Sequence, residues 1–232
     1  MIVIGKNVAI ELFNNNDKIN KIYLYDGFND QKIIDEIAKR KISTIYKTKD
    51  ELFKIDKGNH QGIILDIPDF EYSPIEEIIN LNNGFIVVLD HIEDPHNFGA
   101  IVRTCEAAGV DGIIIPKDRS VEVNSTVMKT SSGALSNMKI SMVTNLNNTL
   151  NKLKEKGYWV VGTTMESKNT YSNFKYPFPL VLIVGNEGKG ISRLVSESCD
   201  ALVSIPMKGK INSLNASVAT GIIVYEIIKN RK

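Results

Sequence analysis

The sequence predicts an α/β protein built around a mostly parallel sheet with helices on both faces. Apolar runs of four to six residues, such as FIVVLD at 85–90, alternate with helix-like segments along the chain. Runs without polar alternation are typical of strands that are buried on both faces. Hydrophobic residues make up 43% of the 232 residues, so the chain can bury a core in one large or two small domains.

Residues 1–70 are predicted to form a small α/β domain. In order, the patterns indicate a helix at 8–13, a strand at 21–26, a helix at 31–41, a strand at 43–48, a helix at 49–55 and a strand at 61–67. Pro, Asn and Gly then mark a linker at 71–84, which holds a short helix, IEEIIN.

Residues 85–232 are predicted to form a second domain of alternating strands and helices. Strands are expected at 85–90, 111–116, 138–143, 158–164, 179–185 and 201–206, and helices at 97–109, 121–135, 146–157, 192–199 and 213–230. Ligands of parallel sheets bind at the carboxyl ends of the strands. We therefore expect the site in the loops after Leu89, Thr163, Val184 and Ile205.

The glycine-rich segment VGNEGKGIS at 184–192 looks at first like a phosphate-binding loop. However, Ile191 stands where a Walker loop needs lysine, and Glu187 would repel a pyrophosphate. The bare backbone at Gly185 favours close approach by a ligand without phosphate, and one with positive charge, such as S-adenosylmethionine. The alternative is an ordinary glycine-rich turn, with Glu187 as an acid at the start of a helix.

Two other segments supply polar side chains near the strand ends. In 94–110, the helix is expected to be capped near Asn97, and Arg103 lies close to the edge of the buried stripe, from which it can reach the strand ends. A surface or interface arginine is the ordinary alternative. In 205–221, Ser213 is expected to cap the last helix, and Asn215 to fall in its first turn.

Several function classes are disfavoured. His91 and His96 lie among carboxylates, but Pro95 breaks helical pairing, so no metal is expected. Cys105 and Cys199 are expected to be buried hydrophobes. The chain has no apolar run long enough for a membrane span and no secretory start, which predicts a cytoplasmic protein. Its net charge of +1 neither supports nor excludes nucleic acid.

Three segments together closely resemble the signature motifs of the SpoU (TrmH-type) RNA ribose 2′-O-methyltransferases: NFGAIVRTCEAAGV, LVLIVGNEGKGIS and IPMKGKINSLNASVATG. The resemblance covers residues 85–232, with Ala216 where the family more often has valine. The segments GKNVAIELF and NHQGIILDI are similar to the L30e-like amino-terminal substrate-binding domain of many members.

The resemblance implies a trefoil-knotted, SPOUT-type α/β domain that binds S-adenosylmethionine at the knot and acts as a homodimer. It implies cofactor contacts from Thr163, Gly185, Ile205 and Leu214. It implies a catalytic set of Asn97, Arg103, Glu187, Ser213 and Asn215. The family proposal makes the arginine a base; since guanidinium holds its proton tightly, we expect Arg103 instead to grip a phosphate and stabilise the developing alkoxide.

RNA is the expected substrate, and the basic run at 38–49 is expected to contact its phosphates, although such a run is often only a solvated helix face. The resemblance points to a guanosine of 23S rRNA. A tRNA ribose methyltransferase is the first alternative. Two further alternatives are a non-catalytic RNA-binding or assembly protein of the same fold and a nucleotide-dependent enzyme of the doubly wound class.

Overall fold

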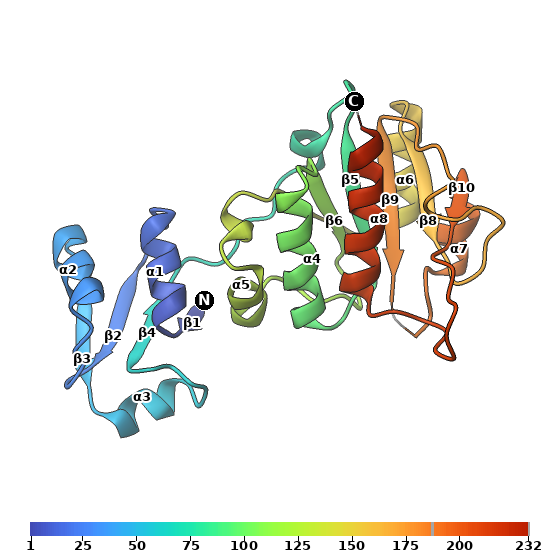
Figure 1. Ribbon diagram of the computed structural model, residues 1–232. Helices are drawn as coiled ribbons and strands as arrows, with labels where there is room; N and C mark the ends of the chain where they lie inside the picture. The colour runs from blue at the N-terminus through green and yellow to red at the C-terminus, as the bar shows by residue number, and fades with distance from the viewer. Residues whose placement is uncertain (187, 232) are drawn as a thin grey trace. The chain divides into compact units, whose positions relative to one another are not determined.

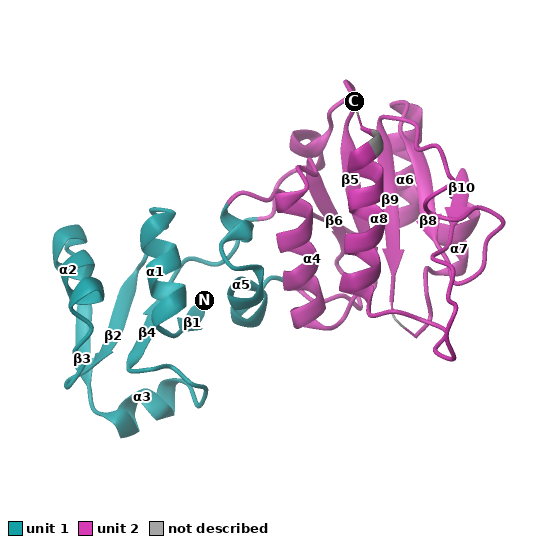
Figure 2. Ribbon diagram, in the orientation of Figure 1, with its two compact units in different colours: residues 1–71, 123–136 teal, residues 72–122, 137–232 magenta. Residues whose placement is uncertain are grey.

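The computed structural model describes residues 1–186 and 188–231, and the chain divides into two compact units. Unit 1 comprises Met1–Glu71 and Val123–Ser136, and unit 2 comprises Tyr72–Glu122 and Asn137–Lys232 (Figure 2). Each unit has its own sheet.

Unit 1 holds a four-stranded sheet in the order β1-β4-β2-β3. Its strands are β1 (Ile2–Ile4), β2 (Lys21–Tyr25), β3 (Thr44–Lys47) and β4 (Ile63–Asp66), and its first three helices are α1 (Lys6–Asn14), α2 (Gln31–Arg40) and α3 (Lys49–Ile55). Strand β4 runs antiparallel to β1 and β2, whereas β2 and β3 are parallel. The predicted elements are present; β1 was missed, because a three-residue strand carries no periodic signal.

The helix α5 (Ser125–Ser131) also belongs to unit 1, although it lies between two strands of unit 2 in the sequence. Asn124 caps it by accepting the amides of two residues in its first turn. Met128 packs against the hydrophobic core of unit 1. After α5, the Ser136 hydroxyl donates to Asp17 Oδ2 over 3.0 Å. This segment, expected within the 85–232 domain, therefore contributes to the core of unit 1.

Unit 2 holds a six-stranded parallel sheet in the order β10-β8-β9-β5-β6-β7. The strands are β5 (Phe85–Asp90), β6 (Gly112–Pro116), β7 (Ile140–Val143), β8 (Trp159–Thr163), β9 (Leu180–Gly185) and β10 (Ala201–Val203). Every residue of β5, β6 and β9 is buried, which explains their unbroken apolar runs. The predicted mixed α/β fold is confirmed; the strand order does not test the trefoil knot, which stays a prediction.

Helices cover both faces of this sheet. The helices α4 (Pro95–Ala107) and α8 (Ala216–Asn230) lie side by side on one face (Figure 1). The helices α6 (Leu146–Glu155) and α7 (Arg193–Glu197) pack on the other, and the 3₁₀ turn Ile75–Ile78 contributes Ile78 to the same core. In the described part of the chain, no helix combines the length and the apolarity that crossing a bilayer requires.

Two helix starts differ from expectation. Helix α4 begins at Pro95, with Asp94 as its cap: the Asp94 carboxylate accepts the amide of His96 over 2.7 Å, and the fixed φ of proline suits the first helical position. Asn97 is therefore inside the first turn. Helix α8 is capped by Asn215, whose Oδ1 accepts the amide of Ser217, so the expectations for Ser213 as cap and Asn215 as first-turn residue were wrong.

Candidate functional site

A cavity of ≈ 100 Å³ lies at the carboxyl ends of β8, β9 and β10, the edge where the sequence placed the site. The end of β9 and the start of α8 lie at this same end of the sheet (Figure 1). Five of the predicted site residues line it: Thr163, Gly185, Ile205, Ser213 and Leu214. These residues come from three separate loops, and the structure brings them together around one space.

The walls of the cavity suit a ligand that carries no phosphate. Val184, Val203 and Ile223 supply apolar surface, while Thr163 and Asn212 supply polar groups. Among the described residues that line the cavity there is no lysine or arginine. Such a lining fits an adenosine and a sulfonium, which needs no cationic partner, better than it fits a nucleotide phosphate.

Gly185 is the point of closest backbone approach in the site. A Cβ atom at this position would lie 2.1 Å from the carbonyl carbon of Gly190 and 2.2 Å from the amide nitrogen of Ile191. The loop folds back because Asn186 and Gly190 exchange backbone hydrogen bonds of 3.2 and 2.8 Å. Gly190 has a φ of 66°, which favours glycine. Glu187, predicted as catalytic, lies outside the described residues.

The loop is also held from β5, through residues that the sequence analysis did not select. Asp90 is buried, and its Oδ2 accepts the amide of Ser192 while its Oδ1 contacts the His91 Nδ1, both over 2.5 Å. The Asn186 side chain donates to the His91 carbonyl over 3.2 Å. The sequence did carry a signal for Asp90, because a carboxylate at the end of a fully apolar strand is expected to be buried, and a buried carboxylate needs hydrogen-bond donors. Asp90 thus holds the end of the glycine-rich loop at Ser192, and the His91 carbonyl holds its beginning at Asn186.

Replacing Asp90 with asparagine is expected to weaken S-adenosylmethionine binding about ten-fold, because an NH₂ group then replaces one of the two buried carboxylate oxygens that contact Ser192 and His91. Isothermal titration calorimetry measures this affinity. Asp94→Asn is the matched control: Asp94 is an exposed carboxylate between β5 and α4, shortly after Asp90 in the chain, and asparagine also caps helices. Equal affinities of the two variants would contradict the role given to Asp90.

Two predicted catalytic residues meet beside the cavity. The Asn215 Nδ2 donates to the Asn97 Oδ1 over 2.8 Å, which joins the first turn of α4 to the start of α8. The neighbours of Asn215 in sequence, Leu214 and Ala216, both line the cavity. Asn97 is buried, so this amide pair fixes the start of α8 beside the cavity.

Arg103 is placed differently from the other predicted residues. It is exposed on α4, and it is not among the described residues that line the cavity. The buried stripe of α4 is as predicted and includes Phe98, Ile101, Val102 and Cys105. Arg103 therefore lies outside this stripe, on the solvent side of the helix.

Metal ligation and thiol chemistry find no support among the residues that the structure describes. No group of three or more His, Cys, Asp or Glu side chains that could hold a metal ion occurs within residues 1–186 and 188–231. Burial raises the pKa of the Cys199 thiol to about 12 and that of the Cys105 thiol further still. Both thiols therefore stay protonated at neutral pH, and a protonated thiol is a weak nucleophile and a poor metal ligand.

Two family models match the chain. The SpoU rRNA Methylase family matches residues 84–225, and a domain described as RNA 2′-O ribose methyltransferase substrate binding matches residues 2–73. The two matches together span nearly the whole chain and correspond to the two predicted segments of the resemblance.

Individual proteins agree with these models. A Bacillus subtilis (strain 168) protein, YacO, assigned to the TrmH family of tRNA/rRNA methyltransferases, is 39% identical over 99% of this chain and 95% of its own. The crystal structure of an AdoMet-bound rRNA methyltransferase from Sinorhizobium meliloti is 25% identical, with a TM-score of 0.79 over 98% of this chain and 86% of its own. The SpoU methyltransferase AviRb from Streptomyces viridochromogenes, in complex with AdoMet, shares the fold, with 21% identity and a TM-score of 0.82 over 100% of this chain and 90% of its own.

Proposed function

This chain belongs to the SpoU rRNA methylase family of S-adenosylmethionine-dependent RNA methyltransferases, and on that premise we propose that it methylates a ribose 2′-hydroxyl, in a guanosine of 23S rRNA. The observation that carries the proposal is the cavity at the carboxyl edge of the unit 2 sheet, with the Asn97–Asn215 pair beside it. The donor and the acceptor ribose would meet at this edge.

The residues around the cavity fit the cofactor. S-adenosylmethionine supplies a methyl group on a sulfonium and carries no phosphate. We assign its contacts to Thr163, Gly185, Ile205 and Leu214, all of which line the cavity. Apolar walls bury the adenosine, and the missing side chain at Gly185 leaves room for the backbone of the loop to close around it.

Methyl transfer requires the ribose oxygen to be held in line with the methyl group. As the O–C bond forms, the S–C bond breaks, and the hydroxyl proton passes to a neighbouring phosphate or to water. We assign the shaping of this crevice to Asn97, Ser213 and Asn215. Arg103 grips the phosphate next to the target ribose and stabilises the developing alkoxide, because a guanidinium keeps its proton and binds phosphate with two N–H groups. Glu187 is proposed to orient this arginine.

We further propose that the enzyme is a homodimer that packs through α8. Val218, Ile222 and Tyr225 follow one face of α8 at spacings of four and three residues, and Val218 and Tyr225 are 50% and 53% exposed. An exposed apolar stripe of this kind favours association. Arg103 lies on the neighbouring helix α4, so a dimer through this face would let each Arg103 serve the cavity of the partner.

The match of residues 2–73 to a substrate-binding domain supports RNA as the partner of unit 1, and the rRNA methyltransferase from Sinorhizobium meliloti supports rRNA as its class. The description of YacO names tRNA as well, which keeps tRNA as the second candidate. For either substrate we propose that the enzyme acts in the cytoplasm.

Two measurements test the proposed function. Calorimetry is expected to show S-adenosylmethionine bound to the purified chain, and mapping of ribose methylation is expected to show one 23S rRNA guanosine methylated only in cells that carry the gene. A tRNA nucleotide that responds instead would favour the second candidate. If RNA methylation is the same with and without the gene, and the chain binds no S-adenosylmethionine, the results would instead favour a non-catalytic RNA-binding or assembly protein.

A further inference from the structure

We propose that unit 1 contains a binding site for one unpaired nucleotide of the RNA substrate, in a cavity of ≈ 560 Å³ separate from the methyl-donor cavity. The cavity lies at the edge where β1, β2 and β3 end and β4 begins. It is formed by the start of α1, the turn after β2, the first turns of α3 and the loop before β4. This inference rests on the proposed function, because it assigns a role in RNA binding.

The rings that line this cavity favour a planar ligand. Tyr25, Phe28 and Phe53 line it, and Phe53 is 52% exposed, so the packing of the core does not account for its position. Two ammonium groups lie over rings: the Lys6 Nζ is 5.0 Å from the centroid of Phe28, and the Lys49 Nζ is 5.3 Å from that of Tyr25. Proteins that hold unpaired bases combine aromatic stacking surfaces with nearby cations that meet the backbone, and this cavity holds both kinds of group.

Polar groups between the rings can recognise the edge of a base. The His60 Nδ1 accepts the amide of Gly62 over 3.1 Å, so the ring proton lies on Nε2 and can be donated to a ligand. The Gln61 Oε1 accepts the amide of Lys6 over 3.0 Å, which leaves the Gln61 NH₂ group as a donor. Asn29, Asn59 and Asp50 complete the lining. Side-chain amides and a carboxylate match the mixed donors and acceptors of an unstacked base.

The charges favour a nucleotide within an RNA chain over a free phosphate. Lys6 is paired with Asp30 over 3.1 Å, and Asp50 lines the cavity, so a small anion finds no concentrated positive charge. Lys49 is exposed at the rim and can meet a phosphate of the RNA backbone. Lys49 ends the predicted basic run at 38–49, in which Lys39 and Arg40 are, by contrast, paired with Glu36.

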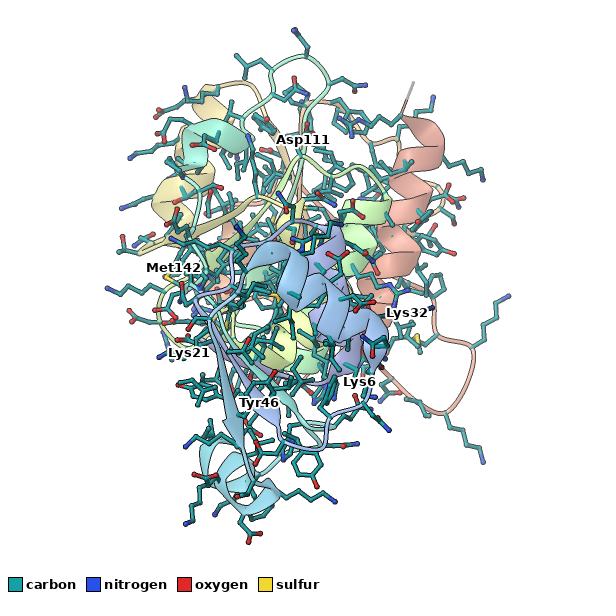
Figure 3. The ribbon with its side chains drawn as sticks, turned by 90° about the vertical axis from the view of Figure 1, so that its left-hand side faces the viewer. Lys6, Lys21, Lys32, Tyr46, Asp111 and Met142 are labelled. Atoms are coloured by element: carbon teal, nitrogen blue, oxygen red, sulfur yellow. The ribbon has the colours of Figure 1, made fainter. Side chains whose placement is uncertain are left out.

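The test uses the full chain and a short fluorescein-labelled RNA of mixed sequence, both single-stranded and as a duplex. Phe53→Ala is expected to weaken single-strand binding about ten-fold by fluorescence anisotropy, because one base–aromatic stack is lost, and to leave duplex binding unchanged. Tyr46→Ala is the matched control: Tyr46 is 63% exposed on β3 of the same unit and is not among the described residues that line the cavity. Lys6 and Tyr46 are labelled in Figure 3.

A second readout follows stacking directly. A 2-aminopurine placed in the single strand is expected to lose fluorescence on binding, and less so with Phe53→Ala. Equal losses of affinity in the Phe53 and Tyr46 variants, or none in either, would overturn the nucleotide site. Calorimetry with S-adenosylmethionine separates this failure from failure of the proposed function. If the native chain binds no cofactor, the proposed enzyme activity is refuted. If the native chain methylates RNA and the Phe53 variant binds RNA normally, only the nucleotide site is refuted.

Discussion

Replacing Gly185 with alanine is expected to lower the affinity for S-adenosylmethionine by about 100-fold or more. The added methyl group would lie 2.1 Å from the Gly190 carbonyl carbon, a distance that forces the loop to move away from the end of β9. The Cβ position is fixed by the Gly185 backbone and the Gly190 atom belongs to the backbone, so no side-chain rotation relieves the clash. Calorimetry measures the affinity, and circular dichroism reports whether unit 2 keeps its fold.

The control lies in the same loop. Among the described residues, a Cβ at Gly188 would meet only the Asn186 Oδ1, at 3.6 Å, which is ordinary contact, so Gly188→Ala is expected to bind the cofactor normally. Should Gly185→Ala fold poorly, Ala219→Met provides a second route, because Ala219 lines the cavity from α8 and a longer side chain fills it. Native affinity in both Gly185→Ala and Ala219→Met would show that the cofactor binds elsewhere.

Arg103→Ala and Asn215→Ala are each expected to lower methyl transfer by about 100- to 1,000-fold, because each removes a group that positions or stabilises the transition state. If Arg103 serves the cavity of the partner, mixing the two inactive variants restores activity. A mixed dimer then has one complete site, made from the intact Asn215 of one chain and the intact Arg103 of the other. With random exchange, about a quarter of native activity returns.

The measurement is methyl transfer to RNA after unfolding and refolding the variants together. Each variant refolded alone is the control for recovery, and Arg103→Ala is expected to bind S-adenosylmethionine with native affinity, since Arg103 does not line the cavity. No restored activity in refolded mixtures would mean that Arg103 acts on its own chain. If light scattering gives the molar mass of a monomer, the proposed dimer is refuted.

The sequence alone was sufficient for the class of fold and for the edge of the sheet at which the cavity lies. Buried parallel strands need apolar side chains on both faces, so FIVVLD and PLVLIVG could be predicted as strands without any tertiary information. Parallel strands end at one edge, so the loops after Thr163 and Val184 had to lie at the same edge, and both residues line the cavity. Ile191 in place of a lysine already argued against phosphate at the glycine-rich loop. These inferences depend on local pattern and on general rules of sheet geometry.

Local pattern did not fix the details that depend on distant partners. Asp94 and Asn97 are both good caps by residue type, and so are Ser213 and Asn215; in the structure Asn215 caps α8 while its NH₂ group donates to Asn97, 118 residues away. The three residues of β1 form a strand only because β4 pairs with them. The sequence by itself determined where the strands end and which residue types follow them, because burial selects apolar runs locally. Only the tertiary structure decided that Asp90 bonds Ser192 and that Arg103 is exposed and does not line the cavity, because hydrogen bonds and exposure are set by segments far apart in the chain.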